Sequence, residues 1–184
     1  MISKIKIHIL LTTLLLTSVI LSPQSSMAKG GVEKAGDVFA ALIPAIGLGS
    51  SLLYEEGNEG TIQFLQSMVT SQAITFGLKS AINKTRPNGD CCNSFPSGHA
   101  TAAFMGATFI HKRYGWKYAV PAYLAAAFVG YSRVQSDKHY TVDVLAGATI
   151  GILSSYYFTK PYKGFNITPL ASNGIYGIHI TKSW

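Results

Sequence analysis

The chain has 184 residues, which suits one domain with one core. Only 12% of its residues are charged while 48% are hydrophobic, a balance that disfavours an ordinary soluble domain and favours a membrane-embedded or exported helical bundle. The net charge of +7 comes from scattered lysines and arginines rather than from a basic run, so we expect no nucleic-acid partner.

Residues 1–28 have the pattern of an export signal. Lys4 and Lys6 precede an apolar run from Ile7 to Leu21, and Ser26 and Ala28 supply small side chains at the usual cleavage spacing. An uncleaved first membrane helix is the alternative. In both cases the chain from residue 29 onward begins outside the cytoplasm.

Five apolar segments follow, and we predict that each is a helix; the second carries an apolar stripe at helical spacing. The predicted helices span Asp37–Tyr54, Thr61–Ile82, Gly98–His111, Tyr118–Tyr131 and His139–Phe158.

The tail after residue 160 has a different pattern. A turn sequence at residues 172–174 precedes Tyr176, Ile178 and Ile180 in alternation, which predicts a β-hairpin. We therefore expect an all-α fold, a compact transmembrane bundle of five to six helices over residues 29–160, with a small C-terminal hairpin in the tail at 161–184. A soluble or peripherally attached exported bundle is the alternative.

If the helices cross a bilayer, the basic residues predict their orientation. The turn that carries Lys112, Arg113 and Lys117 would face the cytoplasm, as would the basic tail after residue 160. The loop at residues 83–96 and the turn at 136–138 would then share the outer face with the exported N-terminus.

Cys91 and Cys92 are adjacent, and the chain has no other cysteine. In an oxidising compartment they could form a vicinal disulfide, pair with another chain or stay free. Two adjacent cysteines do not make a tetrahedral metal site, so we expect no metal here.

A first group of charged residues ends the second predicted helix. Lys79 and Arg86 are seven positions apart, about two helical turns, so both side chains can reach one point if the helix continues toward Thr85. Arginine offers a bidentate fork to phosphate oxygens and lysine a point charge. Lys84 lies between them, and we expect it to face solvent.

The segment Pro96-Ser97-Gly98-His99 predicts the start of a helix. The first backbone N–H groups of a helix lack internal partners and can bind an anion. Gly98 would let that anion approach the backbone closely, Ser97 adds a hydroxyl, and His99 lies in the first turn. Taken alone, the segment also fits an ordinary capped helix with a surface histidine.

The third group is Ser132-Arg133 followed by His139 and Asp143. His139 and Asp143 are four positions apart and so share one helix face. A carboxylate there can accept a hydrogen bond from one ring nitrogen, which leaves the other nitrogen free to attack. Arg133 could bind the group under attack. An aspartate inside an otherwise apolar helix is costly without such a partner.

Together these three groups resemble the three-part signature of the type 2 phosphatidic acid phosphatase and vanadium haloperoxidase superfamily. The matching residues run from Lys79 to Asp143, and every signature position is present.

The resemblance implies a role for each position. His139 would be the nucleophile that forms a phosphohistidine, and Asp143 would orient it. His99 would protonate the leaving oxygen and then activate water. The phosphoryl oxygens would be held by Lys79, Arg86, Ser97, Gly98 and Arg133. The family chemistry implies neither a metal nor another cofactor.

The leading hypothesis is therefore a phosphatase of the bacterial cell envelope, in the inner membrane with its site facing the periplasm, or in the periplasm. Its expected partner is a phosphorylated membrane lipid: phosphatidic acid, phosphatidylglycerophosphate, undecaprenyl pyrophosphate or lipid A. Three alternatives stay open: a soluble periplasmic acid phosphatase, a vanadium-dependent haloperoxidase, and a membrane scaffold without activity.

Overall fold

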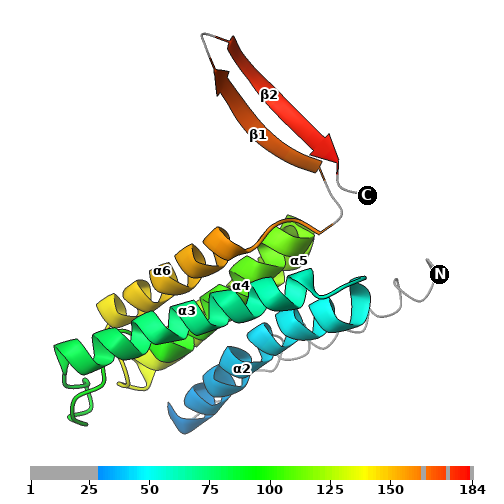
Figure 1. Cartoon of the computed structure of the whole chain (residues 1–184). Helices are drawn as coiled ribbons and strands as arrows, with labels where there is room; N and C mark the ends of the chain where they lie inside the picture. The colour runs from blue at the N-terminus through cyan, green and yellow to red at the C-terminus, as the bar shows by residue number, and fades with distance from the viewer. Residues whose placement is uncertain (1–28, 163–164, 173–174, 183–184) are drawn as a thin grey trace.

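The computed structural model describes residues 29–162, 165–172 and 175–182. Over these residues the chain forms a bundle of helices followed by a two-stranded hairpin (Figure 1). The helices are α2 (Lys29–Tyr54), α3 (Glu59–Ile82), α4 (Gly98–Tyr114), α5 (Trp116–Gln135) and α6 (Thr141–Phe158). The strands β1 (Phe165–Ser172) and β2 (Ile175–Lys182) pair antiparallel and pack against none of the described helices. The predicted helical bundle is confirmed, and the predicted signal at residues 1–28 lies outside the described residues.

Two helix boundaries differ from the prediction in ways that matter for the site. α2 begins at Lys29 instead of Asp37, because its first turns pack closely on α5, where a side chain at Gly36 would overlap the Ser132 hydroxyl. α6 begins at Thr141 instead of His139, because the backbone N–H of His139 turns back to the carbonyl of Arg133 (3.2 Å). His139 therefore lies in a tight loop ahead of the helix.

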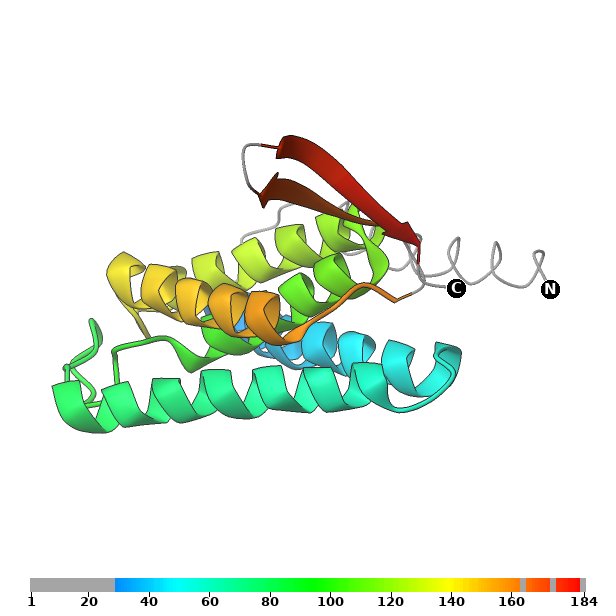
Figure 2. The ribbon, with the colours of Figure 1, turned by 45° about the horizontal axis from the view of Figure 1, so that its top comes forward.

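α4 is the central helix, and it packs against each of the other four (Figures 1 and 2). Small side chains make this possible, since Ala100, Ala103 and Ala107 are fully buried. α6 approaches α4 so closely at Gly147 and Gly151 that a Cβ at either position would overlap a backbone carbonyl of α4. Glycine is thus required on α6 where it touches α4.

The substitution Gly147→Ala tests this contact. The added methyl group would overlap the Ser97 carbonyl oxygen, so the start of α4 must shift. We expect a loss of about 1–3 kcal/mol in the free energy of unfolding, seen as a lower Tm. Gly77→Ala on the outer side of α3 is the control, because its Cβ would meet nothing within 4 Å. This substitution should stabilise the helix by about 0.5–1 kcal/mol. Equal Tm values for the two variants would contradict the close packing.

The described helices bury many hydroxyl side chains and expose many large apolar ones, although Phe64, Met105 and Phe109 lie in the interior. No leucine among residues 30–162 is buried, whereas many serines and threonines are. The buried hydroxyls include Ser67, Ser71, Thr75, Thr101, Thr108 and Ser155. Most of them bond to a carbonyl or to each other, as Thr75 and Thr101 do at 3.1 Å. Small polar residues inside and large apolar residues outside are typical of helices that pack together in lipid.

A buried ion pair closes one end of the bundle. Arg113, which was predicted only as part of a basic turn, pairs with Glu55, and both side chains are almost fully buried. The Tyr114 hydroxyl donates to the same carboxylate (2.7 Å), and Arg113 also donates to the carbonyl of Lys160 (2.9 Å). These bonds join the end of α4 to the α2–α3 turn and to the segment after α6. The candidate site lies at the opposite end.

Candidate active site

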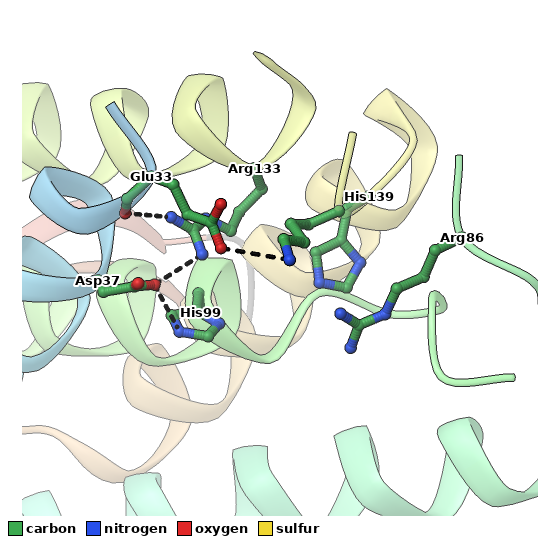
Figure 3. A pocket seen from close by; sticks show the side chains of 7 residues that line it. Glu33, Asp37, Arg86, His99, Arg133 and His139 are labelled. Carbon is green, nitrogen blue, oxygen red and sulfur yellow. Dashed lines mark hydrogen bonds and ion pairs between the residues drawn. The ribbon is translucent and has the colours of Figure 1, made fainter. Parts of the chain in front are cut away.

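A cavity of about 250 Å³ opens where the start of α2, the start of α4 and the loop before α6 meet (Figure 3). Its walls carry almost only charged or titratable side chains. They are Glu33, Asp37, Arg86, His99, Arg133, Lys138 and His139.

Four of the eight residues predicted from the sequence line this cavity: Arg86, His99, Arg133 and His139. Although they come from three separate segments, the fold brings them together (Figure 3). The other four predicted residues lie around the cavity without lining it.

The positions of those four residues follow from the ends of the helices. Lys79, in the last turn of α3, donates to the carbonyl of Asn93 (2.6 Å). Ser97 is the N-cap of α4, its side chain accepts from the Ala100 N–H (3.4 Å), and Gly98 is the first residue of that helix. Asp143 is fully buried in the first turn of α6, where the helix dipole favours a negative charge.

The ring of His139 is held in one tautomer. Its Nδ1 lies 2.6 Å from the carbonyl oxygen of Ser94. A carbonyl can only accept, so Nδ1 must carry the hydrogen and the other ring nitrogen, Nε2, is left with a free lone pair. Burial lowers the pKa of His139 to about 4, and Lys79 and Arg86 add to the shift. At neutral pH the imidazole is therefore uncharged.

The lowered pKa predicts a pH dependence of stability. Unfolded His139 titrates near pH 6.5, so between about 6.5 and 4 the unfolded chain binds the additional proton and the folded state loses stability as the pH falls. We expect the Tm of the wild type, measured relative to that of His139→Asn, to decrease between pH 7.5 and pH 4.5. Asparagine keeps an N–H for the Ser94 carbonyl but does not titrate, which isolates this effect. A constant difference would contradict the lowered pKa.

The structure differs from the expectation that Asp143 accepts directly from His139. Nδ1 is 3.9 Å from the nearer carboxylate oxygen, too far for a hydrogen bond. The reason is that the carboxylate is already occupied. Oδ2 accepts from the Ser94 hydroxyl (2.5 Å) and the Tyr140 N–H (3.0 Å), and Oδ1 accepts from Lys84 (2.7 Å). Asp143 therefore reaches the ring through Ser94.

Lys84 was expected to face solvent, and this expectation was wrong. Its ammonium group is bonded to Asp143 and lies 4.3 Å from the centre of the Tyr140 ring. Neither Lys84 nor Ser94 was identified as a site residue from the sequence. The sequence offered one signal, which was Asp143 in an otherwise apolar helix. Because burial of an ionised carboxylate costs free energy, a cation as well as an imidazole is expected beside it.

Arg133 is fixed by the first turns of α2. Its guanidinium donates to the Asp37 carboxylate (2.7 Å), to the carbonyl of Glu33 (2.6 Å) and to the Ser132 hydroxyl (3.1 Å). Only 3% of the side chain is exposed, on the side that faces the cavity. These three bonds hold the guanidinium in place, and its remaining N–H groups are available to an anion in the cavity.

Two acidic residues in the wall were not identified from the sequence. Asp37 lies between Arg133 and His99, 2.7 Å from the Arg133 guanidinium and 3.2 Å from Nε2 of His99. Glu33 pairs with Lys138 at 3.4 Å on the rim. The sequence did show one signal, the carboxylate of Asp37 in an apolar segment. The partners of Asp37 are distant in sequence, so no spacing connects Asp37 to them.

The arrangement can bind an anion and attack it. Arg86, Arg133 and Lys138 supply positive charge, one imidazole presents a free nitrogen lone pair, and a second imidazole lies across the cavity. Within the described residues no group of three or more His, Cys, Asp or Glu side chains is arranged to hold a metal ion. The adjacent Cys91 and Cys92, joined by a disulfide, lie in the loop that also supplies Asn93 and Ser94.

Comparisons with known proteins identify one family for this chain. The sequence model of the PAP2 superfamily matches residues 60–165. The lipid A 4'-phosphatase of Helicobacter pylori is 34% identical over 143 residues, which cover 72% of this chain and 71% of that protein. The lipid A 1-phosphatase of Porphyromonas gingivalis is 37% identical over 108 residues, which cover 53% of this chain but only 24% of that longer protein. The crystal structure of Aquifex aeolicus LpxE superposes with a TM-score of 0.62 at 21% identity, covering 78% of this chain and 92% of LpxE.

Proposed function

The chain belongs to the PAP2 superfamily and is a phosphomonoester hydrolase, and from this premise we propose that it removes a phosphate group from a membrane lipid through a phosphohistidine on His139. The observation that carries the proposal is the free Nε2 of His139, which faces a cavity lined by Arg86, Arg133 and His99.

We assign the steps as follows. Arg86 and Arg133 bind the phosphoryl oxygens, with Lys79 adding positive charge nearby and the Ser97 hydroxyl and the Gly98 N–H adding donors. Nε2 of His139 attacks phosphorus, the bond to the lipid oxygen breaks, and a proton passes from His99 to that oxygen.

In the second half of the reaction His99 takes a proton from water. The hydroxide attacks the phosphohistidine, phosphate leaves, and Nε2 regains its lone pair. Fixed donors around the phosphoryl group stabilise the charge of both transition states without reorganising.

A membrane location for the bundle is supported by its outward-facing leucines and inward-facing hydroxyls. Within the described residues, Gly30–Tyr54 is the one helix whose length and hydropathy suffice to cross a bilayer. The proposal that all five helices are embedded therefore rests on the apolar side chains of their outer faces and not on the mean hydropathy of each segment. We place the cavity at the outer face of the inner membrane, because the basic turn near Lys112 lies at the other end.

Lipid A is the first substrate to test, because two relatives carry that name. The purified chain should be assayed in detergent against lipid A, phosphatidic acid, phosphatidylglycerophosphate and undecaprenyl pyrophosphate, with release of inorganic phosphate as the readout. We expect at least one lipid to be hydrolysed and vanadate to inhibit competitively. The absence of phosphate release from every lipid, or release that vanadate does not affect, would overturn the proposal. Removal of the protein from membranes by a carbonate wash would instead favour the soluble acid phosphatase.

A further inference from the structure

Behind His139 lies a chain of contacts that ends at Lys84. Lys84 donates to Oδ1 of Asp143 (2.7 Å), the Ser94 hydroxyl donates to Oδ2 (2.5 Å), and the Ser94 carbonyl accepts from His139 (2.6 Å). We propose that Lys84 is a positioning residue, which holds the nucleophile in place through Asp143 and Ser94 without touching the substrate. This inference rests on the proposed role of His139.

The position of Lys84 argues against direct phosphate binding. It does not line the cavity, whereas Arg86, two residues further on, does. Its ammonium group is engaged by Asp143 on one side and by the Tyr140 ring at 4.3 Å on the other. The ammonium group therefore interacts with Asp143 and Tyr140 and not with the cavity.

The buried carboxylate explains why a cation is needed at this point. Asp143 has no exposed surface, and a lone ionised carboxylate in such a place is strongly disfavoured. Two neutral donors reach Oδ2, from Ser94 and Tyr140, but Oδ1 has Lys84 alone as its partner among the described residues. Without Lys84 the carboxylate would tend to take up a proton or turn away from Ser94.

Lys84 also holds Ser94 directly. The Ser94 N–H donates to the carbonyl of Lys84 (2.9 Å), so the two residues close the ends of the loop at residues 84–94. The side chain and backbone of Lys84 therefore act on the same residue, whose carbonyl fixes the tautomer of His139. A displacement of that carbonyl would turn the ring away from the line of attack on phosphorus.

The first test compares Lys84→Met and Lys84→Arg with the wild type. Lys117→Met, at the opposite end of the bundle, is the matched control. We expect kcat of Lys84→Met to fall about 10- to 100-fold, as for a displaced reacting group, with KM nearly unchanged. Lys84→Arg should recover most of kcat, because it restores the charge beside Asp143. A raised KM with an unchanged kcat would instead assign Lys84 to substrate binding and overturn the proposal.

The second test is a double-mutant cycle with Asp143→Asn. If Lys84 acts through Asp143, the double variant should be no slower than Asp143→Asn alone, whereas independent sites would multiply their losses. Multiplied losses, or a Lys84→Met enzyme as fast as the wild type, would refute the positioning role.

Two controls keep the result interpretable. If Lys84→Met does not fold, Lys84→Gln, which keeps a donor without the charge, takes its place in both tests. If the wild type hydrolyses no lipid phosphate, the proposed function fails. If the wild type is active and His139→Asn is not, while the Lys84 variants behave as wild type, only this inference fails.

Discussion

His139→Asn abolishes turnover, with an expected loss of at least about 10⁴-fold in kcat/KM, as for removal of a nucleophile from a catalytic set. Asparagine keeps an N–H that can reach the Ser94 carbonyl but has no counterpart of Nε2, the atom that faces the cavity. The loop should therefore keep its shape while the attacking lone pair is lost. The measurement is phosphate release, together with transfer of radioactive phosphate from a labelled substrate to the protein.

The matched control is His111→Asn. His111 lies in the last turn of α4, at the far end of the bundle, where it contacts Tyr123 and Trp116. This variant should retain wild-type activity and label. If His139→Asn still acquires label, or still turns over within tenfold of the wild type, another group is the nucleophile.

His99→Ala should lower turnover of a lipid substrate by about 10²- to 10⁴-fold, the usual contribution of general acid–base catalysis. Its side chain lies across the cavity from His139 and is held by Asp37 at 3.2 Å (Figure 3). Without it, the leaving lipid oxygen has no proton donor and the attacking water has no base. Both halves of the reaction are slowed.

The choice of leaving group allows the two halves of the reaction, formation and hydrolysis of the phosphohistidine, to be measured separately. p-Nitrophenolate leaves without a proton, so His99→Ala should still form the phosphohistidine from p-nitrophenyl phosphate but hydrolyse it slowly. We expect a burst of p-nitrophenol equal to the enzyme concentration, followed by a slow steady rate. Loss of the burst together with equal defects on both kinds of substrate would argue against the acid–base role of His99.

The main outline of the fold could be predicted from the sequence because it depends on local patterns. Five apolar segments with helical spacing became α2 to α6, and the alternation after Tyr176 became β2. The resemblance of three short charged groups to a known family signature predicted that Arg86, His99, Arg133 and His139 would meet. Helix starts and spacings within a few turns are encoded in adjacent residues.

The parts that could not be predicted depend on contacts between distant segments or on the backbone. Asp37 and Arg133 are 96 residues apart, and no periodicity relates them. The partner of His139 is the backbone carbonyl of Ser94. Because every residue has a backbone carbonyl, the residue type gives no sign of which one the histidine contacts. Lys84 was placed in solvent because it lies between Lys79 and Arg86, and its partner Asp143 is 59 residues away.

The glycine contacts between α4 and α6 have a consequence for how this scaffold can diversify. His99 lies in the first turn of α4 and His139 in the loop just before α6, and these two helices cannot move apart or closer without losing their fit at Gly147 and Gly151. The opposite wall comes from α2, whose Glu33 and Asp37 belong to neither histidine segment. A new headgroup preference would therefore have to come from changes in the first turns of α2 that spare Asp37, because Asp37 holds both Arg133 and His99.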